Sequence, residues 1–246
     1  MRVELQRLQE AGLLQNVSRE GDGKTWSGKS ASLQLCPMYP PQSLLSRHAP
    51  CRKNCACRGP THRRSRHPAP GPGPSSKPAG HGAGTNWHQD NAYFQIPDPL
   101  QGTAMWTAVH DATVANGTIR VIPGSYRVEY EHSRDPFSDH HIRCYPPEDE
   151  AVAIELPAGG VAFFACGVAR ATGANNTDCD RAGILHHFVN GAMKEKPWRK
   201  RKPGENPWLS GPRASGGERE YGQRVSGTWH MEVKRLLQMA VIMSGG

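Results

Sequence analysis

Short apolar or alternating runs, separated by turn residues, dominate the chain from about Lys77 onward. Each run is of strand length and rich in β-branched or aromatic residues, and helical periodicity is scarce. The runs are MWTAVHDAT, TIRVIPGS, AVAIEL, VAFFA and RAGILHHFVN. Many short strands of this kind predict an all-β-dominated domain, an antiparallel barrel or jelly roll.

Two turn sequences separate some of these predicted strands. Ala115, Asn116 and Gly117 stand between the first two, and Asn-Gly between apolar strands is a strong short-range signal for a hairpin. Pro157-Ala158-Gly159-Gly160 separates AVAIEL from VAFFA. The sequence therefore predicts that MWTAVHDAT and TIRVIPGS pair with each other.

The N-terminal third has a different character. MRVELQRLQEAG carries Val3, Leu5 and Leu8 ahead of Gly12, which predicts a short helix. Residues 47–66 are basic with no acidic residue, and residues 68–84 are mostly proline and glycine. Such a segment buries too little apolar surface to offset its chain entropy, so residues 1–76 are interpreted as a basic, disordered arm and residues 77–246 as the folded domain.

Charge and cysteine content narrow the function classes. The chain has 30 Lys and Arg against 22 Asp and Glu, but the excess lies in the arm, so charge says little about what the domain binds. Cys51, Cys55 and Cys57 lie near several histidines in the arm, yet their spacing fits no paired Cys-x2-Cys knuckle; a disordered arm is favoured over a zinc site. With one aromatic residue nearby, Tyr39, the arm is not expected to bind nucleic acid.

The chain is expected to be cytoplasmic and to have no membrane partner. No apolar run approaches the roughly 18 residues of a membrane span, and the first dozen residues lack the apolar core of a signal peptide. Seven cysteines at irregular spacing do not indicate a disulfide framework.

The stretch TNWHQDNAYF suggests metal chemistry. In an extended strand His88 and Asp90 project to the same face, their α-carbons about 6 to 7 Å apart. An imidazole and a carboxylate are two of the three ligands in the 2-His-1-carboxylate triad of non-heme Fe(II). Alone, His-x-Asp is weak evidence, because most such tripeptides are surface pairs.

Three longer motifs carry a family resemblance. They are KPAGHGAGTNWHQDNAYF, WTAVHDATVANGTIRVIPGSYR and GGVAFFACGVARATGANNTDCDRAGILHHFVN, followed by the tail GEREYGQRVSGTW. Together, over about residues 77–240, they resemble the phytanoyl-CoA dioxygenase family of Fe(II)/2-oxoglutarate oxygenases. The resemblance implies a cupin-like double-stranded β-helix with peripheral helices, Fe(II) as cofactor, 2-oxoglutarate as cosubstrate, O2, and a small-molecule or acyl substrate to be hydroxylated.

The resemblance also implies site residues. His88 and Asp90 match the first two iron ligands, and Trp106 matches a residue that lines the cosubstrate pocket. Arg181 matches the arginine that binds the distal carboxylate of 2-oxoglutarate, and Thr172 a residue that assists it. A guanidinium fork suits a carboxylate because it presents parallel donors and keeps its charge.

One position departs from the family pattern. The second histidine ligand of the family stands eleven residues before the carboxylate-binding arginine, and here that position is Arg170, which has no lone pair to offer a metal. Three interpretations stay open: a changed histidine codon, a pseudoenzyme that binds a carboxylate through Arg170 and Arg181, or replacement by His187. The segment before Ser76 also departs from the family, which suggests a misassigned reading frame if it is not a disordered arm.

Two functions of different class follow. The first is an Fe(II)/2-oxoglutarate-dependent dioxygenase with an impaired metal triad. The second is a catalytically inactive, carboxylate-binding domain of the same fold.

Overall fold

The computed structural model describes residues 1–34, 66–69 and 74–190, and the chain divides into two compact units. The first unit comprises Met1–Cys36 and Pro72–Leu185, and the second comprises Pro37–Gly71 and His186–Gly246. His88, Asp90, Trp106, Thr172 and Arg181 all belong to the first unit, whereas His187, the alternative metal ligand, belongs to the second.

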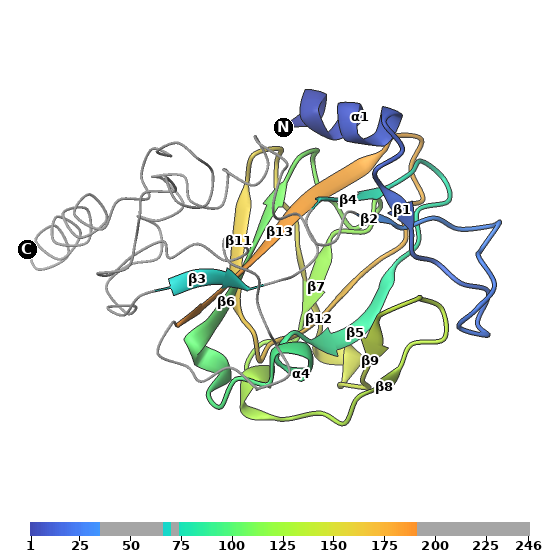
Figure 1. The fold of residues 1–246 in the computed structure, drawn as a ribbon. Helices are drawn as coiled ribbons and strands as arrows, with labels where there is room; N and C mark the ends of the chain where they lie inside the picture. Colours follow the sequence, from blue (N-terminus) through green and yellow to red (C-terminus); the bar gives the residue numbers. More distant parts are fainter. Residues whose placement is uncertain (35–65, 70–73, 191–246) are drawn as a thin grey trace, which may run out of the picture. The chain divides into compact units, whose positions relative to one another are not determined.

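Two antiparallel sheets form the framework (Figure 1). The larger is seven-stranded, in the order β1-β2-β4-β13-β6-β11, with β3 also pairing with β13; its strands are β1 Gln15–Asn16, β2 Leu33–Gln34, β3 Arg66–Ala69, β4 Pro74–Lys77, β6 Gly102–Ala108, β11 Val161–Ala165 and β13 Arg181–Asn190. The smaller is four-stranded, in the order β10-β7-β12-β5; its strands are β5 Thr85–Gln89, β7 Ile119–Val121, β10 Val152–Ile154 and β12 Ala169–Thr172.

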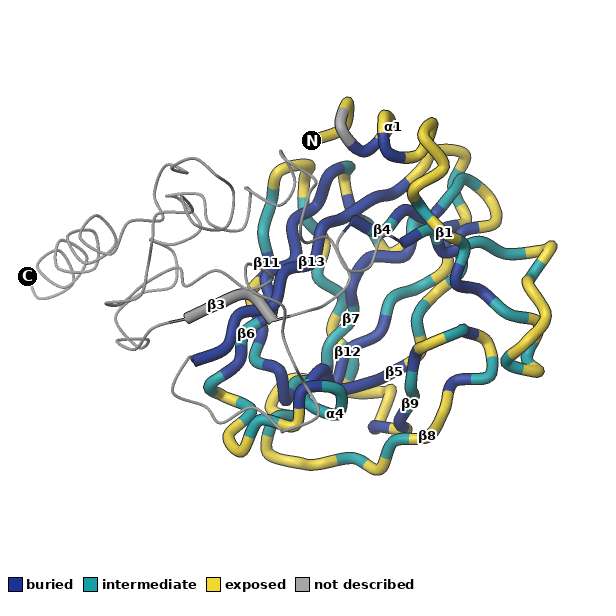
Figure 2. Tube along the Cα trace, in the orientation of Figure 1, coloured by how far each residue is buried: buried dark blue, intermediate teal, exposed yellow. Residues whose placement is uncertain are grey.

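Apolar side chains from both sheets meet in one core. Trp106 on β6 and Phe164 on β11 pack in the same cluster as Ile119 on β7. A second cluster around Trp87 and Ile122 lies on the smaller sheet. In Figure 2 the strands run through the buried part of the unit and the exposed residues lie mainly in the loops. The predicted jelly-roll class is confirmed, with two sheets packed across a shared apolar interior as such folds require.

Helices are short and peripheral, as expected. The opening helix α1 spans Arg2–Glu10 and buries Leu5 and Leu8, which confirms the helix that the N-terminal pattern predicted. The others are α4 Asn91–Phe94 and the single-turn 3-10 helices η1 Pro99–Gln101, η2 Ser125–Arg127 and η3 Glu148–Glu150. Over the residues described, no helix is long and apolar enough to cross a membrane.

The predicted hairpin is wrong. β6 pairs with β11 and lies in the larger sheet, whereas β7 pairs with β10 and β12 in the smaller one. The Asn-Gly signal does mark a tight turn, because Gly117 has a φ of 78° and a side chain there would meet the Gly173 carbonyl. The turn connects the two sheets instead of two neighbouring strands, since each strand finds its apolar partners elsewhere in the chain.

Part of the N-terminal third joins the larger sheet. β1 pairs with β2, and β2 pairs with β4 through Leu33 opposite Ser76. The division of the chain at residue 76 stays a prediction. The basic stretch at 47–65 with its cysteines, and the tail GEREYGQRVSGTW, lie outside the described residues.

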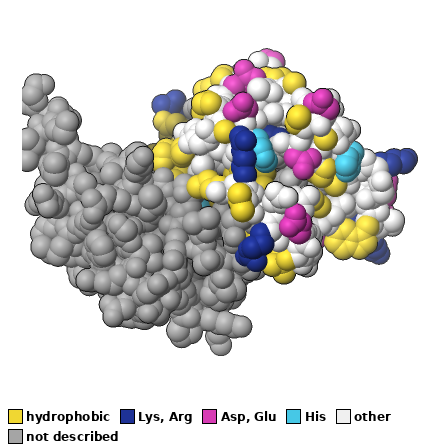
Figure 3. Space-filling view, turned by 90° about the horizontal axis from the view of Figure 1, so that it is seen from above, with side chains coloured by type: hydrophobic (Ala, Val, Ile, Leu, Met, Phe, Trp, Pro, Cys, Tyr) yellow, Lys and Arg dark blue, Asp and Glu magenta, His cyan; other side chains and the backbone are white. Residues whose placement is uncertain are grey.

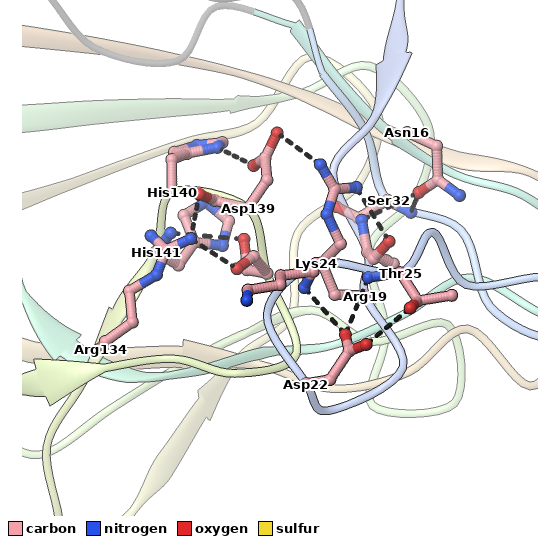
Figure 4. Close-up of polar contacts among 12 residues, drawn as sticks. Asn16, Arg19, Asp22, Lys24, Thr25, Ser32, Arg134, Asp139, His140 and His141 are labelled. Atoms are coloured by element: carbon pink, nitrogen blue, oxygen red, sulfur yellow. Dashed lines mark hydrogen bonds and ion pairs between the residues drawn. The ribbon is translucent and has the colours of Figure 1, made fainter.

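Polar contacts fasten this N-terminal segment to the hairpin of β8 (Ser133–Arg134) and β9 (Ile142–Arg143) (Figure 4). The Arg19 guanidinium stacks on the Trp26 ring at 3.2 Å and donates to Asp139 at 3.5 Å. Asp139 also contacts His140. These groups are partly exposed, so the contacts position the loop and contribute little to stability.

On the face of the molecule shown in Figure 3, basic, acidic and apolar side chains are mixed among neutral ones. No single-sign patch stands out on the described part of that face.

Candidate functional site

The strand β5 and the residue after it place His88 and Asp90 side by side. His88 is the fourth residue of β5, whereas Asp90 has left the extended conformation, with φ −59° and ψ −30°, and precedes α4. Their side chains still converge: His88 Nε2 lies 3.7 Å from Asp90 Oδ1, and both residues are buried. The predicted pairing of the two side chains is therefore present, although strand alternation accounts for only one of them.

Gln89, which lies between His88 and Asp90 in the sequence, is fixed by hydrogen bonds from its side chain and its backbone. Its amide nitrogen donates to the Val128 carbonyl at 2.7 Å and to the Gly167 carbonyl at 2.6 Å. Its backbone N–H donates to Nε2 of His132 at 3.0 Å. These bonds fix the backbone from which His88 and Asp90 project, and nothing in the sequence marked Gln89 or His132 for that task.

The protonation state of His88 suits a ligand. Nδ1 donates to the Asn86 carbonyl at 2.8 Å, which leaves Nε2 with its lone pair directed elsewhere. Burial, and next the nearby Arg170 charge, lower the pKa of His88 to about 4. The imidazole is therefore neutral near pH 7.

Arg170 lies opposite His88 in the pairing of β12 with β5, and it binds Asp90. Its Nε donates to both carboxylate oxygens at 3.1 Å, and Nη2 donates to Oδ1 at 2.6 Å. Arg170 is 7% exposed and Asp90 2%. This is a buried, forked ion pair at the position where the resemblance predicts a second histidine.

A second group of polar residues lies around Arg181, at the start of β13. Arg181 is 1% exposed; its Nη2 donates to the Gly117 carbonyl, its Nε has no hydrogen-bond partner among the described residues, and its guanidinium faces the Trp106 ring at 5.4 Å. Trp106 in turn packs against Gly183, where a side chain would meet the indole. Arg181 thus lies next to Trp106.

Lys77 is the residue that sequence reasoning missed. It stands opposite Arg181 in the pairing of β4 with β13. Its Nζ donates to the Ala83 carbonyl at 2.6 Å, to Thr172 Oγ1 at 2.8 Å and to the Gly173 carbonyl at 2.6 Å. A buried lysine is uncommon enough to be a signal, but only the pairing of β4 with β13 brings it to Arg181.

Burial shifts both of these cations. It lowers the pKa of Arg181 to about 10, and burial together with the Arg181 charge places the pKa of Lys77 well below its ordinary value. Among the described residues no carboxylate contacts either side chain. Arg181, with a pKa of about 10, keeps its positive charge near pH 7, and a buried cation without a counter-charge favours binding of an anion.

The candidate residues therefore form two clusters: the metal cluster is His88, Asp90 and Arg170, and the carboxylate cluster is Lys77, Trp106, Thr172 and Arg181. Thr172 joins the second through Lys77 and also accepts from the Thr85 backbone N–H at 3.0 Å. His187 faces Ala69 in the second unit, so its replacement of the missing ligand stays a prediction. The roles of all these residues stay predictions as well.

Comparison with known proteins identifies the family. The sequence model described as "Phytanoyl-CoA dioxygenase (PhyH)" matches residues 54–183, more than half of the chain. The chain belongs to the phytanoyl-CoA dioxygenase family. Fe(II) and 2-oxoglutarate are the cofactor and cosubstrate of this family, as the resemblance implied.

Two curated relatives support the assignment. A probable phytanoyl-CoA dioxygenase of Caenorhabditis elegans is 29% identical over 110 residues, which is 42% of this chain and 35% of the relative. Phytanoyl-CoA dioxygenase 1 of Oryza sativa subsp. japonica is 29% identical over 107 residues, 42% of this chain and 38% of the relative. The aligned region spans little more than a third of each.

Solved structures show the same fold. The α-ketoglutarate-dependent epimerase SnoN superposes with a TM-score of 0.59 at 17% identity, over 80% of this chain and 73% of that one. EvdO2 from Micromonospora carbonacea var. aurantiaca gives a TM-score of 0.54 at 21% identity, over 82% and 85%. At these identities the likeness concerns the fold alone.

The side chains of this phytanoyl-CoA dioxygenase family member do not fit the family's metal as they lie. An ion held by His88 and Asp90 would have to share the Asp90 carboxylate with the fixed positive charge of Arg170, which donates to both of its oxygens. Over the described part of the chain, no group of three or more His, Cys, Asp or Glu side chains is arranged to hold a metal ion.

Proposed function

We propose that this chain keeps the carboxylate-binding half of a phytanoyl-CoA dioxygenase family site and lacks the metal-binding half. As its sequence stands, it binds a carboxylate ligand without oxygenase turnover. The main observation behind this proposal is that Arg170 donates hydrogen bonds to both oxygens of Asp90. Asp90 is the one carboxylate that the family motif supplies to the metal.

Electrostatics supports the loss of the metal. A guanidinium cannot be deprotonated at accessible pH, so Arg170 keeps a full positive charge within the His88–Asp90 pair. A divalent cation at the same place would have to break a buried ion pair and then stand beside a fixed cation. Each of these costs is on the order of several kcal/mol at low dielectric.

The carboxylate half is supported by Arg181 and Lys77. Both are buried, and among the described residues their side chains contact carbonyls, a hydroxyl and an aromatic face but no acid. Arg181, with a pKa of about 10, keeps its positive charge near pH 7. A ligand carboxylate supplies the missing counter-charge and an acceptor for Arg181 Nε.

The second candidate is the oxygenase itself, acting with O2 on a small-molecule or acyl substrate. The observation that favours it is that His88 Nε2 and Asp90 Oδ1, two atoms able to bind a metal ion, lie 3.7 Å apart. Under this alternative, Arg170 swings away and a weaker ligand set remains.

The Arg170→His variant distinguishes the two candidate functions. We expect anaerobic titration of the wild-type protein with Fe(II) and 2-oxoglutarate to give no stoichiometric metal binding, and the Arg170→His variant to bind one ion, because the substitution removes the competing cation and adds an imidazole. Arg19→His, which alters an arginine beside Asp139 in the hairpin contact, is the matched control and should behave as wild type. Tight, stoichiometric iron binding by the wild-type protein would instead establish the second candidate.

A further inference from the structure

Each of the two sheets has two edge strands, and an unpaired edge can pair with a strand of another chain. Three of these edges are protected. β1, at one end of the larger sheet, is two residues long. β5, at one end of the smaller sheet, lies against β9, and the Cys144 N–H just after β9 donates to the Trp87 carbonyl at 2.7 Å. β10, at the other end, lies between the exposed acids of Glu148–Glu150 and Glu155, which repel a second acidic strand.

β11, which ends the larger sheet beyond β6, lacks these protections (Figure 1). It spans Val161–Ala165, and its side chains alternate so that Phe163 is 40% exposed while Phe164 is buried. No charged residue occurs between Glu155 and Arg170, and the strand contains no proline. Among the described edges, β11 is therefore the one best suited to pair with another strand.

The pairing with β6 determines which backbone groups of β11 face outward. Beyond the two ends of the strand, the Ala108 N–H donates to the Gly160 carbonyl at 3.0 Å and the Cys166 N–H donates to the Gly102 carbonyl at 3.1 Å. Because hydrogen-bonded pairs alternate along an antiparallel ladder, the even-numbered residues of β11 bond to β6. The odd-numbered residues direct their N–H and C=O groups to the free edge; they are Val161, Phe163 and Ala165.

These outward groups are largely unused within the described part of the chain. The Ala165 carbonyl accepts from the Val168 N–H at 3.0 Å, and a carbonyl oxygen has a second lone pair for another donor. The other outward groups of Val161, Phe163 and Ala165 have no backbone partner among the described residues. The edge can therefore form a full set of ladder hydrogen bonds with a second strand.

The edge is complementary to a second copy of itself. When two β11 strands pair antiparallel about a two-fold axis through Phe163, each Phe163 lies opposite its own copy and each Val161 lies opposite Ala165 of the other chain. Every outward N–H then meets an outward carbonyl. The strand carries no charge, so no like charges meet across the axis, and the two exposed Phe163 rings bury each other.

We propose that β11 is a homodimerisation edge, through which two copies of this chain pair antiparallel along Val161–Ala165 with Phe163 on the two-fold axis. The two larger sheets then form one continuous sheet. A pairing of one short strand buries less than a standard interface of about 1,200 Å² or more, so the association is weak, with a dissociation constant on the order of 10 to 100 µM. The proposal is independent of the metal and carboxylate clusters.

The first test is sedimentation equilibrium of the full chain at concentrations from about 1 to about 300 µM, which span the expected dissociation constant. We expect the weight-average mass to rise from that of one chain toward that of two. A mass that stays at one chain over this range would overturn the second copy as the partner of this edge and leave it to an extended segment of another protein. Species larger than a dimer would overturn the two-fold arrangement, which uses up the edge.

Charge substitutions at Phe163 test the axis. Phe163→Lys and Phe163→Glu each place like charges opposite one another, so each variant alone should dimerise at least about tenfold more weakly than wild type. An equimolar mixture of the two should dimerise more tightly than either alone, because lysine then faces glutamate. Val152→Lys alters an exposed residue of the β10 edge and is the matched control, which should dimerise as wild type does.

A proline distinguishes backbone pairing from contact between side chains. Val161 is the first residue of β11 and its N–H points away from β6, so Val161→Pro removes an outward donor from each copy and leaves the pairing with β6 intact. We expect dimerisation to weaken at least about tenfold. Thermal unfolding shows whether each variant folds, and the wild-type concentration series stands without them. Wild-type dimerisation by Val161→Pro, or no recovery in the mixture of Phe163 variants, would overturn the strand pairing.

Discussion

Two buried arginines, one in each of the two sheets, have opposite surroundings. Arg170 on β12 finds a carboxylate within the chain and binds it through two nitrogens. Arg181 on β13 is buried more deeply, yet it meets a carbonyl and an indole face. The first charge is neutralised by the fold, whereas the second is left for something else to neutralise.

The difference teaches how one substitution can change a site without changing the fold. A histidine at position 170 would leave Asp90 as an uncompensated anion beside a neutral imidazole, which is a site for a cation. An arginine at the same position supplies that cation from within. Arg181 is unaffected because its partners lie on β4 and in the turn at Gly117.

Removing Asp90 should give the largest effect, because it makes Arg170 resemble Arg181. Asp90→Ala leaves a buried guanidinium without its carboxylate, and we expect a loss of about 3 to 5 kcal/mol in the free energy of unfolding. Asp90 makes no side-chain capping hydrogen bond to α4, so its removal does not uncap that helix. Urea unfolding followed by circular dichroism measures it.

Two companion variants control this result. Asp139→Ala removes the carboxylate from the partly exposed Arg19 pair and should cost no more than about 1 kcal/mol. The double variant Asp90→Leu with Arg170→Met removes both charges and should recover most of the loss. If Asp90→Ala and Asp139→Ala cost the same, the buried pair does not hold this region together.

The sequence predicted the members of both clusters better than it predicted their contacts. His88, Asp90 and Arg170 could be found because they lie in motifs whose order and spacing are local, and the structure brings the three together. That Arg170 would bind Asp90 could not be read from spacing. It depends on β12 and β5 pairing in a register that sets Arg170 opposite His88.

Long-range pairing also explains what sequence reasoning missed or got wrong. The local pattern predicted the jelly-roll class and the opening helix, and both are confirmed. The Asn116-Gly117 turn was found, but the hairpin inferred from it was wrong, because turn chemistry fixes a backbone angle and does not choose a strand's partner. Lys77 was overlooked for a similar reason: its neighbour Arg181 is distant in sequence.

Removing the Arg181 guanidinium should change the free energy of unfolding less than removing the Asp90 carboxylate does. Arg181→Met keeps an apolar stem against Trp106 and relieves an unpaired buried charge, but it leaves the Gly117 carbonyl without its donor. These terms oppose each other, so we expect ligand-free stability within about 1 kcal/mol of wild type. Urea unfolding without and with 2-oxoglutarate measures it.

Unfolding measured with added ligand tests whether Arg181 binds a carboxylate. If the proposed carboxylate site is correct, 2-oxoglutarate should raise the unfolding midpoint of the wild-type protein and leave that of Arg181→Met unchanged, because the variant lacks the guanidinium that binds the carboxylate. A loss of about 3 kcal/mol or more in the ligand-free variant would mean that Arg181 has a compensating partner after all, and that its surroundings do not differ from those of Arg170 as described.

The smallest expected effect concerns pH and the backbone between His88 and Asp90. His132 is bound in its neutral form: Nε2 accepts from the Gln89 backbone, and Nδ1 donates to the Tyr130 carbonyl at 2.8 Å. A proton on Nε2 would face the Gln89 N–H, and burial lowers the pKa of His132 below 6.5. The folded chain therefore binds this proton less readily than the unfolded chain does.

The sign follows from that difference. Stability from His132 is present above about pH 6.5 and is lost as pH falls, with a slope below about 1.4 kcal/mol per pH unit, the limit for one proton. Other buried histidines add to the total slope, so the comparison is between the wild-type protein and His132→Gln, measured as unfolding free energy at about pH 7.5 and about pH 5.5, on either side of the ordinary histidine pKa. At the higher pH we expect the variant to be less stable than the wild-type protein, because it lacks the hydrogen bond from the Gln89 backbone to His132. Its free energy of unfolding should fall less on acidification. Parallel pH profiles for the two proteins would show that the His132 contact does not set the pH response of the Arg170 region.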